Sequence, residues 1–139
     1  MAGYMTKMIG NVYEGELTNG TEAAVANGTL LTLGTDGLTL VLPAADSATK
    51  LVAKEKTTIY DGIPAVRYSV QKLEGTYYLV ENGFDGVTSA EYDARNYEVP
   101  VGAFLRAHPL AVGDEFVVAT EANVTVGTAY GVKADGTVG

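Results

Sequence analysis

The stretch Val66-Arg-Tyr-Ser-Val-Gln71 alternates apolar and polar side chains. Its apolar residues share one face of an extended chain and its polar residues share the other, because side chains change face at every residue of a strand. Leu38–Leu42 alternates in the same way, with its leucines on one face. Both patterns are typical of strands buried on one side, so we expect these leucines to face a core.

A second run of β-forming residues, Thr76–Glu81, follows the first strand after the turn signal Glu74-Gly75. We expect the two runs to pair as a hairpin. Asn-Gly and Asp-Gly dipeptides recur along the chain and place residues that tolerate positive φ at the turns, which is typical of a sandwich or barrel. Further strands are expected at 30–33, 57–60, 97–101, 104–107, 115–120 and 129–133.

Helix signals are few. Thr88-Ser-Ala-Glu91 fits a capping box and predicts one or two helical turns through Arg95, although an irregular loop fits this segment equally well. A second short helical stretch at Thr21–Ala26 has a weaker signal. We therefore predict an all-β fold with at most one short helix, built as a compact sandwich or partly open barrel with an extended N-terminal arm.

The length of 139 residues fits one domain. We assign residues 14–139 to a single β domain. The first 13 residues differ from the rest, since they hold all three methionines and no acidic residue before Glu14. They form either an edge strand or an arm that becomes ordered on a partner, and both interpretations stay open.

Composition excludes several classes of function. The chain has no cysteine, so it has no disulfides, thiolate metal sites or cysteine nucleophile. Its formal net charge of −8 disfavours nucleic acid as a partner, because phosphate backbones need a basic surface. No apolar run approaches the ~20 residues that span a bilayer, and the N-terminus lacks the apolar core of a signal peptide. We expect a soluble protein that binds neither nucleic acid nor membrane.

His108 is the single histidine. A catalytic histidine needs a nucleophile and an orienting carboxylate, and the serines lack a nucleophile-elbow context. We expect His108 to lie at a strand end, bonded to backbone or water, and we predict no catalytic or cofactor-binding residue. A small hydrolase is the least favoured alternative.

The acidic loop Glu81–Asp93 suggests calcium, because hard cations prefer clustered oxygen ligands. Compared with an EF-hand loop it fails, since Gly83 and Tyr92 stand where ligands are required. We expect a solvated loop and no metal, although a looser Ca²⁺ site stays open. The Asn-x-Thr triplets at Asn19, Asn27 and Asn123 are interpreted as turns.

Nine tyrosines and no tryptophan are the remaining feature of the composition. Tyrosine offers an apolar face and a hydroxyl, which suit both glycan-binding platforms and protein interfaces. Ordinary β-propensity with burial explains most of them. A carbohydrate-binding module is therefore an alternative from a different class of function.

Four segments resemble small proteins of tailed bacteriophages that are encoded beside the major capsid protein. The segments are Met5-Thr-Lys-Met-Ile-Gly-Asn-Val-Tyr-Glu-Gly15, Glu55-Lys-Thr-Thr-Ile-Tyr-Asp-Gly-Ile-Pro-Ala-Val-Arg67, Thr76-Tyr-Tyr-Leu-Val-Glu-Asn82 and Leu105-Arg-Ala-His-Pro-Leu-Ala-Val-Gly-Asp-Glu115. The resemblance is to head decoration (cement) proteins and related small virion proteins.

That resemblance implies a non-enzymatic structural protein assembled in the host cytoplasm and located on the capsid surface of the virion. Its implied partners are the major capsid protein and other copies of the chain, as a trimer; a tail-tube or head-fibre component is the alternative within this class. An N-terminal arm that adds a strand to a capsid sheet would use backbone hydrogen bonds. The expected contact residues are Tyr4, Met5, Met8, Ile9 and Tyr13.

Overall fold

The computed structural model describes residues 3–7, 17–59, 62–82, 97–120 and 123–139, and these form strands and turns without a helix. The prediction of an all-β fold is confirmed. The strands are β1 (Gly3–Lys7), β2 (Thr18–Asn19), β3 (Val25–Ala26), β4 (Leu30–Leu33), β5 (Thr39–Val41), β6 (Lys50–Ile59), β7 (Ile63–Lys72), β8 (Tyr78–Val80), β9 (Glu98–Val99), β10 (Ala107–Pro109), β11 (Glu115–Ala119) and β12 (Ala129–Tyr130).

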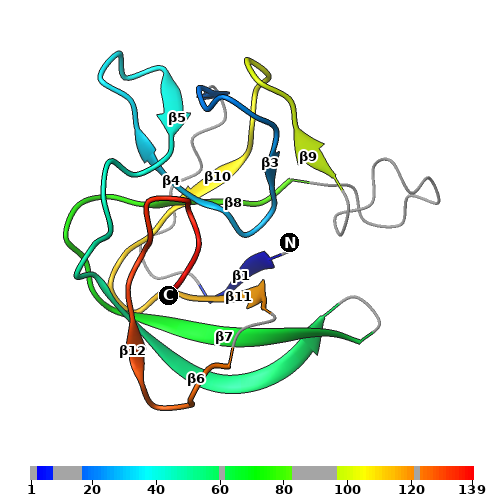
Figure 1. Ribbon diagram of the computed structural model, residues 1–139, viewed down its shortest axis with the longest axis vertical. Coiled ribbons are helices and arrows are strands. Elements are labelled where there is room, and N and C mark those ends of the chain that lie inside the picture. The colour runs from blue at the N-terminus through cyan, green and yellow to red at the C-terminus, as the bar shows by residue number, and fades with distance from the viewer. Residues whose placement is uncertain (1–2, 8–16, 60–61, 83–96, 121–122) are drawn as a thin grey trace.

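Two five-stranded sheets and one two-stranded sheet make up the fold (Figure 1). The large sheet has the order β1-β11-β7-β6-β12, and its long strands β6 and β7 curve strongly. The small sheet has the order β10-β8-β4-β5-β2, and β3 pairs with β9 alone. The arrangement is a compact β-sandwich or partly open barrel.

The main core lies between the large sheet and the small sheet. The alternation along β7 directs Val66, Tyr68 and Val70 into it, and Leu30 and Leu79 enter from the small sheet. The Tyr68 ring lies 5.8 Å from the ring of Phe116 on β11, between ring centroids. The periodicity of the sequence therefore gave the correct buried face of β7.

A second core covers the opposite face of the small sheet. Leu31 and Val80, which follow Leu30 and Leu79 in the chain, pack there against Val25 of β3 and Val99 of β9. Both faces of β4 and β8 are thus buried. This explains why Leu30-Leu31 and Leu79-Val80 are adjacent pairs of apolar residues, whereas β7 alternates.

The predicted hairpin between Val66–Gln71 and Thr76–Glu81 is wrong. β7 pairs with β6 and β11, whereas β8 pairs with β4 and β10 in the other sheet. The chain crosses from one sheet to the other between them, where Tyr77 is buried in the main core. The true hairpin partner of β7 is β6, the strand that precedes it in the chain.

Two further predictions need correction. Leu40 is fully buried, but Leu38 and Leu42 are exposed, because β5 covers only Thr39–Val41 and Leu38 belongs to the preceding turn. Thr21–Ala26 forms bends and strand β3 rather than a helix. The predicted helical turns at 88–95 lie outside the described residues.

The N-terminal strand β1 is the terminal strand of the large sheet and pairs with β11 in antiparallel fashion. Gly3 approaches Gly28 and Val117 so closely that a Cβ there would lie 2.8 Å from the Gly28 Cα and 2.6 Å from the Val117 carbonyl oxygen. Only glycine fits this crossing. The boundary predicted at residues 13/14 lies outside the described residues and stays a prediction.

Candidate functional site

The predicted contact residues fall partly within β1. Tyr4 lies opposite Val117, is half-buried, and packs against the apolar cluster of Ile59, Ala65 and Val117. Met5 lies opposite Phe116 in the same ladder. Met8, Ile9 and Tyr13 lie outside the described residues. The structure therefore places Tyr4 and Met5 on a terminal strand of the large sheet.

His108 has a side-chain partner that sequence reasoning missed. It is buried in β10, and its Nε2 atom bonds the Glu81 carboxylate, which follows β8 in the neighbouring strand. The expectation of a backbone or water partner is wrong. His108 lies opposite Leu79 in the ladder. Glu81 comes two residues after Leu79, just beyond the end of β8, so its side chain lies on the same face as Leu79 and His108. A buried histidine and its carboxylate stabilise each other in this position.

The described serines are engaged away from this pair. The Ser47 hydroxyl donates to the Thr49 hydroxyl at 2.8 Å, and the Ser69 hydroxyl accepts a hydrogen bond from the Gln71 amide at 2.8 Å. Ser89 lies outside the described residues. The Ser47 hydroxyl thus stabilises a turn, and the Ser69 hydroxyl bonds a neighbouring side chain on the same face of β7.

The outer face of the large sheet carries an ion cluster. Arg67 lies between Glu55 and Glu115, with its Nε atom 3.2 Å from the Glu55 carboxylate and its guanidinium also bonded to Glu115. The three residues belong to adjacent strands β6, β7 and β11. Opposite charges across neighbouring strands stabilise the ladder, so this cluster has a structural explanation.

The possible calcium loop is described only at Glu81 and Asn82, and its other residues lie outside the described ranges. Glu81 bonds His108, and the Asn82 side chain bonds the backbone of Arg106. Within the described ranges, no three His, Asp or Glu side chains are grouped so that they could hold a metal ion.

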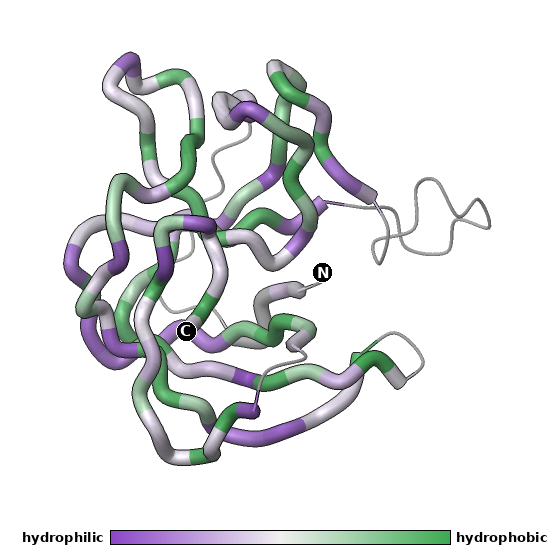
Figure 2. Tube along the Cα trace, viewed as in Figure 1, coloured by the Kyte–Doolittle hydropathy of each residue, from purple (hydrophilic) through white to green (hydrophobic). Residues whose placement is uncertain are grey.

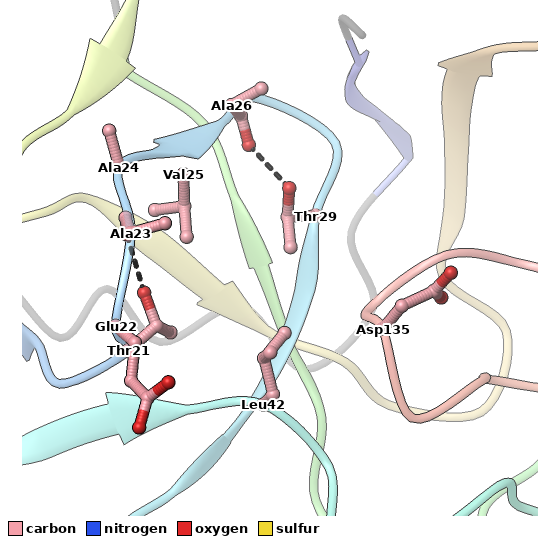
Figure 3. Close-up of a pocket in the computed structure, with 9 residues that line it drawn as sticks. All are labelled: Thr21, Glu22, Ala23, Ala24, Val25, Ala26, Thr29, Leu42 and Asp135. Carbon is pink, nitrogen blue, oxygen red and sulfur yellow. Dashed lines mark hydrogen bonds between the residues drawn. The ribbon is translucent and has the colours of Figure 1, made fainter.

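A pocket of about 240 Å³ lies between the start of β3 and the C-terminal segment (Figure 3). Small apolar side chains and Leu42 form most of its lining, with Glu22 and Asp135 on different sides. The hydroxyls of Thr21 and Thr29 donate to the carbonyl oxygens of Ala23 and Ala26. The pocket is therefore an apolar depression with an acidic rim, suited to a small apolar or cationic group.

Large apolar side chains are exposed around strands β2 and β5. Phe104 is 71% exposed and Leu38 is 68% exposed. Thr18 of β2 lies between their segments, since it pairs with Thr39 on one side and with Phe104 on the other. The Thr18 backbone N–H donates to the Leu38 carbonyl oxygen at 3.2 Å. Leu38 and Phe104 thus belong to adjoining segments of one surface.

Acidic residues lie on segments near these apolar residues, and the exposed Arg106 lies two residues after Phe104. Asp36 is exposed and accepts hydrogen bonds from the Leu38 N–H and the Thr39 hydroxyl, which lower the pKa of its carboxyl group below the usual value. Glu22 and Glu98 are exposed near Asn19, whose amide group donates to the carbonyl oxygens of the adjacent residues Ala23 and Val99. Sequence reasoning missed this surface because Leu38 was assigned to a buried face.

Comparison with protein-family models, with curated proteins and with solved structures gave no match. Among the described residues, no helix is long and apolar enough to span a membrane. The described tyrosines are all buried or half-buried: Tyr4, Tyr68, Tyr77, Tyr78, Tyr97 and Tyr130. A glycan-binding platform needs an exposed aromatic face, and among the described residues Phe104 rather than a tyrosine offers one. The carbohydrate-binding alternative stays a prediction.

Proposed function

We propose that the chain is a non-enzymatic structural protein of a tailed-phage virion that binds the outer surface of the head and stabilises it. The observation that carries the proposal is the position of β1, a terminal strand next to β11 that bears Tyr4 and Met5. Beyond Gly3, which lies against Gly28, the unpaired edge of β1 would offer backbone groups to a partner sheet, and side chains of one face would give specificity. The sequence resemblance supplies the class of partner, the major capsid protein.

Stabilisation of a head needs no catalytic group. A protein that binds the expanded capsid but not its dissociated subunits stabilises the assembled state by mass action. A rigid all-β domain suits this role, since a pre-organised surface loses little conformational entropy on binding. The two-sided burial of β4 and β8 gives the domain such a rigid centre.

The test uses heads purified from a phage in which the gene for this chain has been deleted. We expect the purified chain to sediment with these heads and to restore their resistance to heat. Heads that neither bind the chain nor change in heat resistance would overturn the proposal. Sedimentation with purified tails instead of heads would support the tail-tube alternative.

A pair of variants tests the role of β1. Tyr4→Ser removes an aromatic side chain from the strand, whereas Tyr97→Ser removes a half-buried tyrosine that packs against the second core. Both lose similar packing, but only Tyr4→Ser is expected to weaken sedimentation with heads. Equal binding by the two variants, with both still folded by circular dichroism, would remove β1 from the contact.

A further inference from the structure

Three residues on adjoining segments of the small sheet form a row, Phe104, Thr18 and Thr39. Thr18 of β2 pairs with Phe104 in an antiparallel bridge and with Thr39 of β5 in a parallel ladder. Residues that pair directly across two strands share one face of the sheet. Because neighbouring strands lie about 5 Å apart, the row places an aromatic ring and two hydroxyl groups side by side over about 10 Å.

The chain neighbours of these residues show which face the row occupies. Leu17, Leu40 and Leu105 each adjoin one residue of the row, and all three are buried in the second core. Adjacent residues of an extended chain point to opposite faces. The row therefore lies on the face turned away from the second core, the same face from which Leu30 of β4 enters the main core.

This face is covered at β4 and β8 and open at β5 and β2. Leu30 and Leu79 are fully buried, whereas Phe104 is 71% exposed and the two threonines of the row are half-buried. β5 lies far from the β6–β7 hairpin of the large sheet, at the opposite end of the molecule, where the chain is coloured by a mixture of apolar and polar residues (Figures 1 and 2). Most of the Phe104 ring is therefore in contact with solvent.

Two glycines keep the face low beside the row. A Cβ at Gly20 would lie 2.7 Å from the Cβ of Thr39, and a Cβ at Gly34 would lie 2.5 Å from the Thr39 hydroxyl oxygen. A side chain at either position would displace Thr39. The Phe104 ring is thus the largest group of the row, and a flat ligand can lie along the threonines with one edge against the ring.

Polar groups continue the row away from the ring. The Thr18 hydroxyl donates to the Leu38 carbonyl oxygen at 3.5 Å, and the Thr39 hydroxyl donates to Asp36 Oδ1 at 3.0 Å. Each hydroxyl oxygen can still accept a hydrogen bond. Asp36 Oδ1 also accepts from the Leu38 N–H at 2.9 Å, so the exposed carboxylate has a fixed orientation. The row therefore ends in an oriented acceptor, Asp36 Oδ2.

A hydrogen-bond donor lies on the other side of the ring. Phe104 and Arg106 are exposed and alternate with the buried residues Leu105 and Ala107, so the two exposed residues share a face. A guanidinium group only donates and a carboxylate only accepts. An anionic ligand would meet Asp36 and a cationic ligand would meet Arg106, whereas an uncharged ligand rich in hydroxyl groups can bond to both.

Uncharged sugars have the chemistry that this face requires. The C–H bonds on one side of a sugar ring pack on the negative face of an aromatic ring, and its hydroxyl groups donate to carboxylate and hydroxyl oxygens. A protein interface instead takes most of its affinity from several large side chains in packed pockets, and this row has one large side chain.

We propose that the row of Phe104, Thr18 and Thr39, with the Asp36 carboxylate at its end, binds an oligosaccharide of uncharged sugars. The sugar ring stacks on Phe104 and its hydroxyl groups bond along the row. The binding needs no capsid and is a property of the purified chain, so it does not rest on the proposed function.

An array of immobilised oligosaccharides built from glucose, galactose, mannose and N-acetylglucosamine tests the site, with sialylated and sulfated oligosaccharides as charged controls. The purified chain is expected to bind an uncharged oligosaccharide, and calorimetry with that oligosaccharide in solution gives the affinity. Phe104→Ser should weaken binding by about tenfold or more, because the stacking surface is lost. Leu38→Ser is the matched control, since it removes an exposed apolar side chain from the adjoining turn and should bind like the wild type.

Two conservative variants separate the ring from the carboxylate. The chain has no tryptophan, so Phe104→Trp keeps a stacking surface and introduces a single indole, whose fluorescence should change when the oligosaccharide is added. Asp36→Asn keeps an oxygen that can accept the hydrogen bonds of the turn but removes the charge. It should weaken binding by about fivefold, because hydrogen bonds to a charged group are stronger.

Several results would show that the proposal is wrong. These are no binding to any uncharged oligosaccharide of the array, a preference for the sialylated or sulfated controls, and wild-type affinity in Phe104→Ser. If the chain binds no oligosaccharide and Phe104→Ser, still folded by circular dichroism, loses sedimentation with phage heads, the ring is a protein contact instead. Oligosaccharide binding by a chain that does not sediment with heads would support this site while removing the proposed function.

Discussion

The side-chain amide of Asn19 holds together three segments around β2. It donates to the carbonyl oxygens of Ala23 and Val99 at 3.0 Å each, and its oxygen accepts a hydrogen bond from the Thr21 N–H at 2.8 Å. The side chain is buried, so each group depends on these partners. The last bond forms an Asx turn and confirms the interpretation of this Asn-x-Thr triplet as a turn.

Asn19→Asp is expected to destabilise the protein by about 2–4 kcal/mol, because a carboxylate cannot donate and would face two carbonyl oxygens in a buried site. Urea denaturation followed by circular dichroism measures the loss. Asn123→Asp makes the same chemical change at an exposed position and should alter stability by less than about 0.5 kcal/mol. Equal effects of the two changes would contradict this role of Asn19.

The buried phenol of Tyr68 makes the stability of the fold depend on pH in the alkaline range. Burial, with a smaller contribution from Tyr130, raises the pKa of the Tyr68 phenol from 10.0 to about 12. The unfolded chain loses this proton first, so the stability contributed by the neutral phenol is full below pH 10 and is lost as pH rises from 10 to about 12. Tyr68→Phe should reduce the loss of stability over this interval by on the order of 1–2 kcal/mol. If the urea midpoint depended on pH equally in the wild type and in Tyr68→Phe, this prediction would be contradicted.

The existence of most strands was predictable, but their partners were not. Alternation along Val66–Gln71 and the apolar run Leu30–Leu33 are local signals, and both stretches are strands. Pairing depends on contacts distant in sequence, such as the main core that Tyr77 enters as the chain crosses between sheets. The charged stretch Lys54–Lys56 hid the middle of β6, because these residues have low β-propensity and lie at a bulge.

The correct pairing of β7 can be tested with cysteine pairs, since the natural chain has no cysteine. Val52→Cys with Ser69→Cys joins residues that lie directly opposite each other in the β6–β7 ladder, so a mild oxidant is expected to cross-link them. Ser69→Cys with Val80→Cys is the control, because a hairpin through Glu74-Gly75 would have made those two residues partners. Non-reducing electrophoresis after a digest between the cysteines measures the bond. Cross-linking of the control pair alone would support the hairpin between Val66–Gln71 and Thr76–Glu81 instead.

At the scale of the molecule, the C-terminal segment connects the two sheets. β12 pairs with β6 of the large sheet, while the Gly136 carbonyl oxygen accepts a hydrogen bond from the Leu30 N–H of the small sheet at 2.8 Å. Val132 is buried in the main core and pairs with Val138. No local sequence pattern indicated this link between the two sheets.

Deletion of residues 134–139 is expected to lower the free energy of unfolding by on the order of 3–5 kcal/mol, because the buried Leu30 N–H loses its acceptor and Val138 no longer covers the core. For a domain of this size such a loss lowers Tm by roughly 10 °C or more. Thr137→Ala removes the γ-methyl group and the hydroxyl bonded to Asp135 but keeps the backbone of the segment, so it serves as the control, with a small expected change. Calorimetry measures both. An unchanged Tm after the deletion would show that the sheets are held together by the core alone, since the hydrogen bonds of the segment would then contribute nothing measurable.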